Sequence, residues 1–126
     1  MQPGRPLHVL IADDQPLFVR RLELLLELEA KIEVVGSAKD GAEAVELAET
    51  LHPDVVLMDI EMPRLDGLQA TAQIRAHDPA THVVMLTASE SATSVARARV
   101  LGADYVMKSR IDSDLLSTIL PTSPES

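Results

Sequence analysis

The chain has 126 residues, a formal net charge of −9 and no cysteine. Its length fits one domain, its acidic balance argues against a nucleic-acid-binding surface, and the lack of cysteine excludes a disulfide scaffold, a thiol nucleophile and a cysteine-based zinc site. We expect a cytoplasmic protein with an aliphatic core, because the sequence has one Phe, one Tyr and no Trp, no run as long as a membrane span and no signal peptide.

Five short aliphatic runs are the candidate strands, and two of them are almost continuously apolar. Continuous apolarity, in place of alternation, is typical of strands that are covered on both faces, as in a parallel sheet. The runs are "LHVLIA" (7–12), "IEVVG" (32–36), "DVVLM" (54–58), "HVVML" (82–86) and "DYVM" (104–107).

Segments with helical periodicity separate these runs, and each places apolar residues on one face. The segment at 90–101 has the poorest apolar face, and a short helix is expected near the end of the chain. The apolar sets at helical spacing are Phe18, Leu22, Leu25 and Leu26, then Ala44, Leu47, Ala48 and Leu51, then Ala70, Thr71 and Ile74, and finally Leu115, Leu116, Ile119 and Leu120.

Start and stop signals agree with these helices. Asp14 and Asp40 each precede a helical segment and are predicted N-caps, with Pro16 suited to a first helical turn. Pro53 and Gly102 mark two helix ends. The order is therefore strand then helix, five times. This alternation predicts an α/β fold with a parallel sheet and helices on both faces.

Polar residues that can carry chemistry follow the strands at their carboxyl ends. In an open parallel sheet these ends share one edge, and the ligand crevice lies there. We therefore expect several carboxylates, a hydroxyl and an ammonium group to converge. The residues are Asp13 and Asp14 after the first strand, Asp59 and Glu61 after the third, Thr87 after the fourth and Lys108 after the fifth.

Clustered carboxylates need a compensating charge, because like charges raise one another's pKa and resist burial. A divalent cation supplies it, and oxygen ligands favour Mg²⁺ or Mn²⁺ over zinc. Asp59 is then a candidate nucleophile, since carboxylates form aspartyl phosphates. Lys108 would neutralise charge on phosphoryl oxygens, and Thr87 would donate a hydrogen bond to one of them.

Each of these residues also has a simpler interpretation. Asp59 alone could be a polar residue that closes a buried strand, and Asp13 or Asp14 could cap the first helix. Thr87 and Lys108 say little by themselves. The functional interpretation rests on all of them occurring together at strand ends.

The sequence resembles the receiver domains of bacterial two-component response regulators. The stretches that carry the resemblance are "IADDQPLFVRRLELLLE", "DVVLMDIEMPRLDGLQA", "VVMLTAS" and "GADYVMKS". The first is most similar to receivers that precede a LuxR-type helix-turn-helix domain. The resemblance implies a flavodoxin-like five-stranded parallel sheet of order 2-1-3-4-5.

The resemblance also implies roles for individual residues. Asp59 would accept a phosphoryl group from a sensor histidine kinase. Mg²⁺ would be bound by Asp14 and Asp59, by Asp13 through water and by the Glu61 backbone carbonyl. Thr87 and Tyr105 would form the switch, and Lys108 would be the lysine of the family pattern. Many receivers have Pro after this lysine, whereas this chain has Ser109, which leaves open whether the Lys108–Ser109 peptide is cis.

The implied protein is a phosphorylation-activated switch and not an enzyme in the usual sense. Phosphorylation would change the side formed by the fourth helix, fifth strand and fifth helix, and so control dimerisation or an attached transcriptional domain. Residues 1–120 would be the receiver, and 121–126 a tail or the start of a linker. The domain itself would bind neither nucleic acid nor membrane.

Three alternatives remain at this point. A haloacid-dehalogenase-like phosphatase also uses an Asp after a strand, but its pattern has a second Asp where this chain has Glu61. A flavodoxin-like nucleotide-binding module would need a Ser/Thr/Gly-rich loop where this chain has "DDQP". A receiver fold used only as a binding scaffold would not need the complete set of acids, Thr87 and Lys108.

Overall fold

The computed structural model describes residues 5–62, 65–88 and 92–120. A five-stranded parallel sheet of order β2-β1-β3-β4-β5 forms its centre, which confirms the predicted fold. The strands are β1 (Leu7–Ala12), β2 (Ile32–Ala38), β3 (Val55–Asp59), β4 (His82–Thr87) and β5 (Asp104–Met107). The helices are α1 (Pro16–Glu27), α2 (Gly41–Leu51), α3 (Gly67–His77), α4 (Ala92–Val100) and α5 (Ile111–Ile119), with a 3₁₀ turn at Lys108–Arg110.

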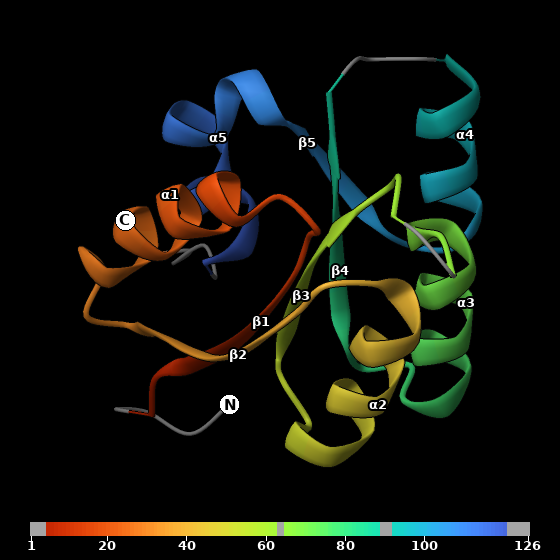
Figure 1. Ribbon diagram of the computed structural model, residues 1–126, viewed down its shortest axis with the longest axis horizontal. Coiled ribbons are helices and arrows are strands. Elements are labelled where there is room, and N and C mark those ends of the chain that lie inside the picture. Colours follow the sequence, from red (N-terminus) through yellow and green to blue (C-terminus); the bar gives the residue numbers. More distant parts are fainter. Residues whose placement is uncertain (1–4, 63–64, 89–91, 121–126) are drawn as a thin grey trace, which may run out of the picture.

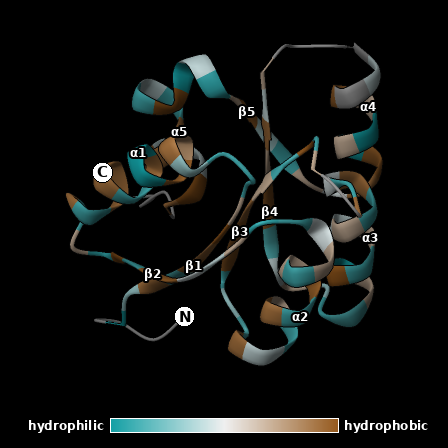
Figure 2. Cartoon of the chain, in the orientation of Figure 1, coloured by the Kyte–Doolittle hydropathy of each residue, from teal (hydrophilic) through white to brown (hydrophobic). Residues whose placement is uncertain are grey.

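Helices cover both faces of the sheet, with α1 and α5 on one side and α2, α3 and α4 on the other (Figure 1). Alternate residues of β1 supply two hydrophobic clusters: Val9 and Ile11 pack with α1 and α5, whereas Leu10 and Ala12 pack with α2, α3 and α4. The helices mix hydrophobic and hydrophilic residues along their length (Figure 2), as expected for one buried face. The buried core is aliphatic, as predicted.

The two central strands end later than the apolar runs suggest. Asp59 is the last residue of β3 and lies beside Leu86 of β4, and Thr87 is the last residue of β4. The backbone N–H of Ile60 still donates to the Leu86 carbonyl at 3.1 Å. The sheet ladder therefore holds the backbone of Asp59 itself, which makes its position well defined.

The predicted cap of the second helix is confirmed, and that of the first is wrong. The Asp40 carboxylate accepts a hydrogen bond from the Glu43 N–H at 2.8 Å at the start of α2. At α1 the N-cap is Gln15, not Asp14, and its side chain makes no capping hydrogen bond. The buried Asp13 carboxylate instead accepts a hydrogen bond from the Gln15 N–H at 2.8 Å. Helix α1 therefore begins one residue later than predicted.

The end of α4 agrees with prediction. Gly102 follows it with a φ of 73°, the left-handed region that glycine adopts without strain. Pro53 follows the left-handed His52 at the end of α2.

Among the described residues no helix is both long and apolar enough to cross a lipid bilayer. Pro63, Ser89 and the predicted tail 121–126 lie outside the described residues.

Helix α3 begins with a reciprocal cap that holds the loop after β3. The Asp66 carboxylate accepts from the Gln69 N–H at 2.8 Å, and the Gln69 side chain accepts from the Asp66 N–H at 3.4 Å. Replacing Asp66 with alanine is expected to lower the free energy of unfolding by about 1 kcal/mol, measured by urea denaturation. Asp66→Asn should lose much less, because asparagine is an equally good N-cap. Equal losses in the two variants would contradict this account of the cap.

Candidate functional site

Three carboxylates meet at the carboxyl edge of the sheet. Asp13, Asp14 and Asp59 each place one oxygen within 4.8 Å of the others. Asp13 follows β1 and Asp59 ends β3, and they are only 2% and 6% exposed, whereas Asp14 faces solvent. The adjacent strands β1 and β3 bring the two buried acids together.

Lys108, directly after β5, brings the compensating charge. Its ammonium lies 2.9 Å from Asp13 Oδ2 and 3.5 Å from Asp59 Oδ2. The side chain of Lys108 is 16% exposed, so these ion pairs are largely shielded from water. The structure thus joins four of the residues predicted from sequence: Asp13, Asp14, Asp59 and Lys108.

The oxygen atoms of the cluster are suited to a hard cation. Asp13 Oδ2 is buried and accepts no hydrogen bond from the described residues, although the Lys108 ammonium is close to it. Asp59 Oδ1 accepts from the Glu61 N–H at 3.2 Å. The Glu61 side chain is exposed and is not part of the carboxylate group. An oxygen-only set with one solvent-facing carboxylate fits Mg²⁺, which keeps several water ligands.

Burial shifts the ionisation of Asp59. The pKa of its carboxyl is raised from 3.8 to about 6, mainly by desolvation and also by the Asp13 carboxylate, while Lys108 and the Glu61 N–H act in the opposite direction. Near neutral pH Asp59 is therefore ionised at a cost in stability.

The shift predicts how the stability of Asp59→Asn depends on pH. A raised pKa means that the folded protein binds more protons than the unfolded chain between pH 3.8 and about 6, so stability falls as pH rises through this window. Each pKa unit corresponds to about 1.4 kcal/mol, so the cost above pH 6 is at most about 3 kcal/mol.

Asp59→Asn is expected to raise the free energy of unfolding at pH 7.5, without divalent cations, by about 1–2 kcal/mol. The gain is smaller than the limit because Oδ1 accepts from the Glu61 N–H, so the asparagine NH2 group would face the Lys108 ammonium in place of Oδ2. The gain should shrink toward zero as the pH is lowered to 4. Urea denaturation at several pH values measures it. A gain that is independent of pH would contradict the raised pKa.

The predicted switch residues lie on the neighbouring strands. Thr87 is 7% exposed, ends β4 and lies beside Met107 of β5. Tyr105 is half-buried beside Met85 and packs against the cluster under α2, α3 and α4. Thr87 is thus on the strand next to that of Asp59, and Tyr105 is on the following strand, against the cluster that contains Ala98 of α4. Their switch roles stay predictions.

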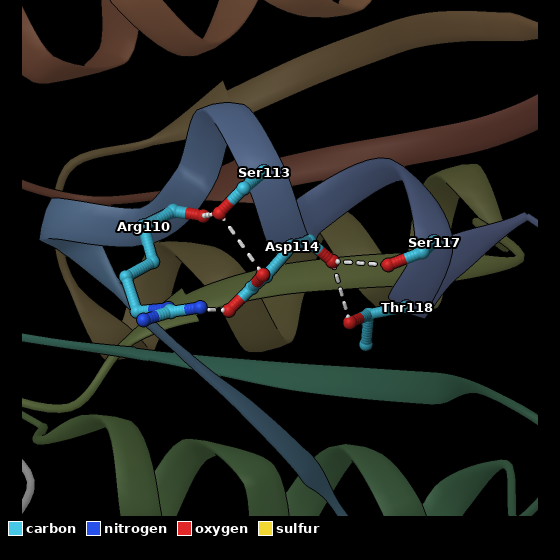
Figure 3. Close-up of polar contacts among 5 residues, drawn as sticks. All are labelled: Arg110, Ser113, Asp114, Ser117 and Thr118. Atoms are coloured by element: carbon cyan, nitrogen blue, oxygen red, sulfur yellow. Dashed lines mark hydrogen bonds and ion pairs between the residues drawn. The ribbon is translucent and has the colours of Figure 1, made fainter.

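A hydrogen-bonded turn directly after Lys108 holds the start of α5 (Figure 3). Asp114 accepts from Arg110 Nε at 2.9 Å and from Ser113 Oγ at 3.0 Å, and the Arg110 hydrogen bond lowers the pKa of Asp114. Ser117 and Thr118 donate to the Asp114 carbonyl. The Arg110 side chain therefore bonds to the first turn of the helix that it precedes. The described residues contain no cis peptide, so Lys108–Ser109 is trans.

Sequence patterns do not predict two of the residues at this site. Gln15 Oε1 lies 3.5 Å from the Lys108 ammonium, and the centroid of the Phe18 ring lies 4.5 Å from it. Helical periodicity predicts Phe18 only as a residue of the apolar face of its helix. Its spacing from Asp13 and Asp14 places it in the first turn beside the acids, but only the fold brings Lys108 to it.

Comparisons with known proteins identify the class. Residues 9–120 match the response regulator receiver domain family, and the chain belongs to this family. Phosphorylation-dependent switching is general among receivers, which take phosphoryl groups from histidine kinases. The match argues against the phosphatase and nucleotide-binding alternatives.

The proteins that are similar to this chain include a transcriptional regulator and an enzyme. The chain is 45% identical over 115 residues to the transcriptional regulatory protein PdtaR of Mycobacterium tuberculosis, covering 90% of this chain and 55% of that protein. It is 47% identical over 85 residues to protein-glutamate methylesterase/protein-glutamine glutaminase 4 of Myxococcus xanthus, covering 68% of this chain and 24% of that protein. The chain thus spans about a quarter to half of these relatives.

A solved structure supports the predicted subfamily. A DNA-binding response regulator of the LuxR family from Staphylococcus aureus superposes with a TM-score of 0.84 and 31% identity, covering 90% of this chain and 95% of that chain. The similarity agrees with the LuxR-type resemblance of the first helix region.

Proposed function

We propose that this chain is a phosphorylation-activated switch that accepts a phosphoryl group on Asp59 from the phosphohistidine of a sensor histidine kinase. The observation that carries the proposal is the buried Asp59 carboxylate at the end of β3, with Asp13 and Asp14 beside it and the Lys108 ammonium 3.5 Å from its Oδ2. A neutral side chain at this buried position would stabilise the fold more than a carboxylate does. The charge of Asp59 is therefore not explained by the stability of the fold.

Phosphoryl transfer requires mainly that the protein positions the reacting groups and stabilises the charge on the transferring oxygens. A carboxylate oxygen of Asp59 forms a bond to phosphorus as the bond from phosphorus to the histidine nitrogen breaks, and the freed imidazole takes a proton from solvent. Lys108 stabilises the charge on the transferring oxygens, and Thr87 donates a hydrogen bond to one of them. Thr87 ends β4, which lies next to β3, and Lys108 directly follows β5, one strand further along.

A bound Mg²⁺ would be held by Asp14 and Asp59, by Asp13 through water and by the Glu61 backbone carbonyl, and would neutralise charge on the phosphoryl oxygens. The buried Oδ2 of Asp13, whose nearest charged partner is the Lys108 ammonium at 2.9 Å, supports this proposal because it accepts no other hydrogen bond from the described residues. The cation would also relieve the repulsion that raises the pKa of Asp59.

The kinase would meet the sheet edge beside α1. Leu17 is 88% exposed at the start of α1, and a hollow of about 530 Å³ next to it is lined by Asp14, Gln15, Pro16, Leu17, Phe18 and Arg21. An exposed apolar side chain next to the acceptor suits contact with a partner helix.

The output would pass from Thr87 and Tyr105 to the side formed by α4, β5 and α5, and control dimerisation or an attached transcriptional domain.

Intact-protein mass after incubation with acetyl phosphate tests the proposal. The wild type is expected to gain one phosphoryl group in Mg²⁺ and none in EDTA. The same sample should not turn over a generic phosphate ester, since turnover would instead support a phosphatase. If neither acetyl phosphate nor a panel of phosphorylated histidine kinases labels the chain, the fold serves as a binding scaffold and the proposal is wrong.

A further inference from the structure

The first turn of α1 contacts the ammonium group that serves the acceptor site. Lys108 Nζ lies 4.5 Å from the centroid of the Phe18 ring and 3.5 Å from Gln15 Oε1. Phe18 is half-buried and packs against the cluster under α1 and α5. The protein has only this one Phe, and its ring lies against the cation.

The position of a lysine ammonium group has to be fixed by the contacts around it. Its ammonium stands on a flexible stem of four carbons, and holding it in one place costs side-chain entropy. The Asp13 carboxylate attracts it most closely, at 2.9 Å, whereas Asp59 Oδ2 is 3.5 Å away. The ammonium thus lies between the two carboxylates, and contacts on its other side decide how freely it can move away from the acceptor.

An aromatic face attracts a cation in a different way. The negative charge of its quadrupole is fixed, so the attraction does not depend on the ionisation of Asp13 or Asp59 or on what compensates them. The contact therefore persists when the carboxylates are neutralised. A Phe ring anchored in the core is also rigid, which limits where the ammonium group can lie.

We propose that Phe18 is a positioning residue, whose ring face holds the Lys108 ammonium at the acceptor Asp59 and so sets the rate of phosphoryl acceptance. This inference rests on the proposed function. Phe18 does not touch the reacting atoms and acts only through Lys108. Gln15 supports the same position from the helix N-cap.

Two substitutions separate the ring face from simple packing. Phe18→Leu keeps an apolar side chain against the core but removes the aromatic face. Phe18→Tyr keeps the face. The rate constant for phosphorylation by acetyl phosphate in Mg²⁺ is expected to fall about fivefold in Phe18→Leu, which equals about 1 kcal/mol at 1.36 kcal/mol per factor of ten. Phe18→Tyr should stay within about twofold of the wild type.

A second measurement reads the contact without phosphorylation. In the protein free of divalent cations, the NMR signals of the Lys108 ε-methylene protons should be shifted upfield by the Phe18 ring, and this shift should persist in Phe18→Tyr and vanish in Phe18→Leu. Urea denaturation of both variants checks that they are folded.

The outcomes are distinguishable. Equal rates in the wild type and Phe18→Leu, or an equal loss of rate in Phe18→Leu and Phe18→Tyr, would overturn the positioning role. An unshifted Lys108 signal in the wild type would overturn the contact itself. A wild type that cannot be phosphorylated by any donor would instead overturn the proposed function, while the NMR shift would still decide whether Phe18 holds Lys108.

Discussion

Asp59→Asn is expected to abolish phosphorylation while leaving the protein folded. Asparagine has the shape of aspartate, and its side-chain oxygen can still accept from the Glu61 N–H, but a neutral amide is a very poor nucleophile. The same substitution should stabilise the chain near neutral pH, because it removes a buried charge whose pKa is raised to about 6. Loss of labelling in a more stable protein cannot be attributed to unfolding.

The measurement is the intact mass after incubation with acetyl phosphate and Mg²⁺, compared across variants at matched concentration. Glu46→Gln is the matched control, since Glu46 is an exposed acid on α2 and its loss changes the net charge equally. The control should be labelled like the wild type. Labelling of Asp59→Asn at the wild-type rate would mean that another group, such as Asp13 or Asp14, accepts the phosphoryl group.

Gly67→Ala is expected to be the most damaging small substitution near the site. A Cβ atom at Gly67 would lie 2.1 Å from the Asp59 carbonyl oxygen and 2.9 Å from the Ile60 Cα. Both neighbours are backbone atoms, so the start of α3 would have to move away from β3. We expect the free energy of unfolding to fall by about 2–3 kcal/mol, although alanine favours the helix over glycine by about 1 kcal/mol.

Gly36→Ala provides the matched control for this prediction. There a Cβ would meet only side-chain ends, Leu51 Cδ1 at 3.0 Å and Leu10 Cδ1 at 3.6 Å, which can adjust. Its cost should stay below about 1 kcal/mol. Because the Gly67 N–H also donates to the Ile60 carbonyl at 2.9 Å, Gly67→Ala should slow phosphorylation as well. Similar urea midpoints for the two variants would show that the close approach at Gly67 is unimportant.

Much of the fold follows from the sequence because its strands are buried on both faces. The run Val55–Met58 has no polar residue, and such continuity is possible only where helices cover both sides. Once the strands are parallel, Asp13, Asp59, Thr87 and Lys108 must end at one edge. The shared edge of the site residues therefore follows from the parallel sheet, which local patterns predict, whereas the strand order that sets their neighbours is implied only by the resemblance to receiver domains.

The remaining details depend on contacts between distant segments. The sequence placed Asp14 at the N-cap of α1, but Asp13 reaches the Gln15 N–H first because β1 carries it into the buried edge. Phe18 could be predicted as an apolar helix residue, whereas its place beside Lys108 requires the position of β5. Asp59 and Thr87 belong to strands because neighbouring strands extend the ladder, which no single run reveals.

The central claim is that Asp59 itself receives the phosphoryl group, and chemical mapping tests it most directly. Borohydride reduces an acyl phosphate to an alcohol, so a phosphorylated aspartate becomes homoserine, which peptide mass spectrometry locates. After treatment with acetyl phosphate we predict homoserine at position 59, formed in Mg²⁺ and absent in EDTA. Homoserine at position 13 or 14, or a phosphoryl group that resists reduction because it is an ester on a hydroxyl, would contradict the account.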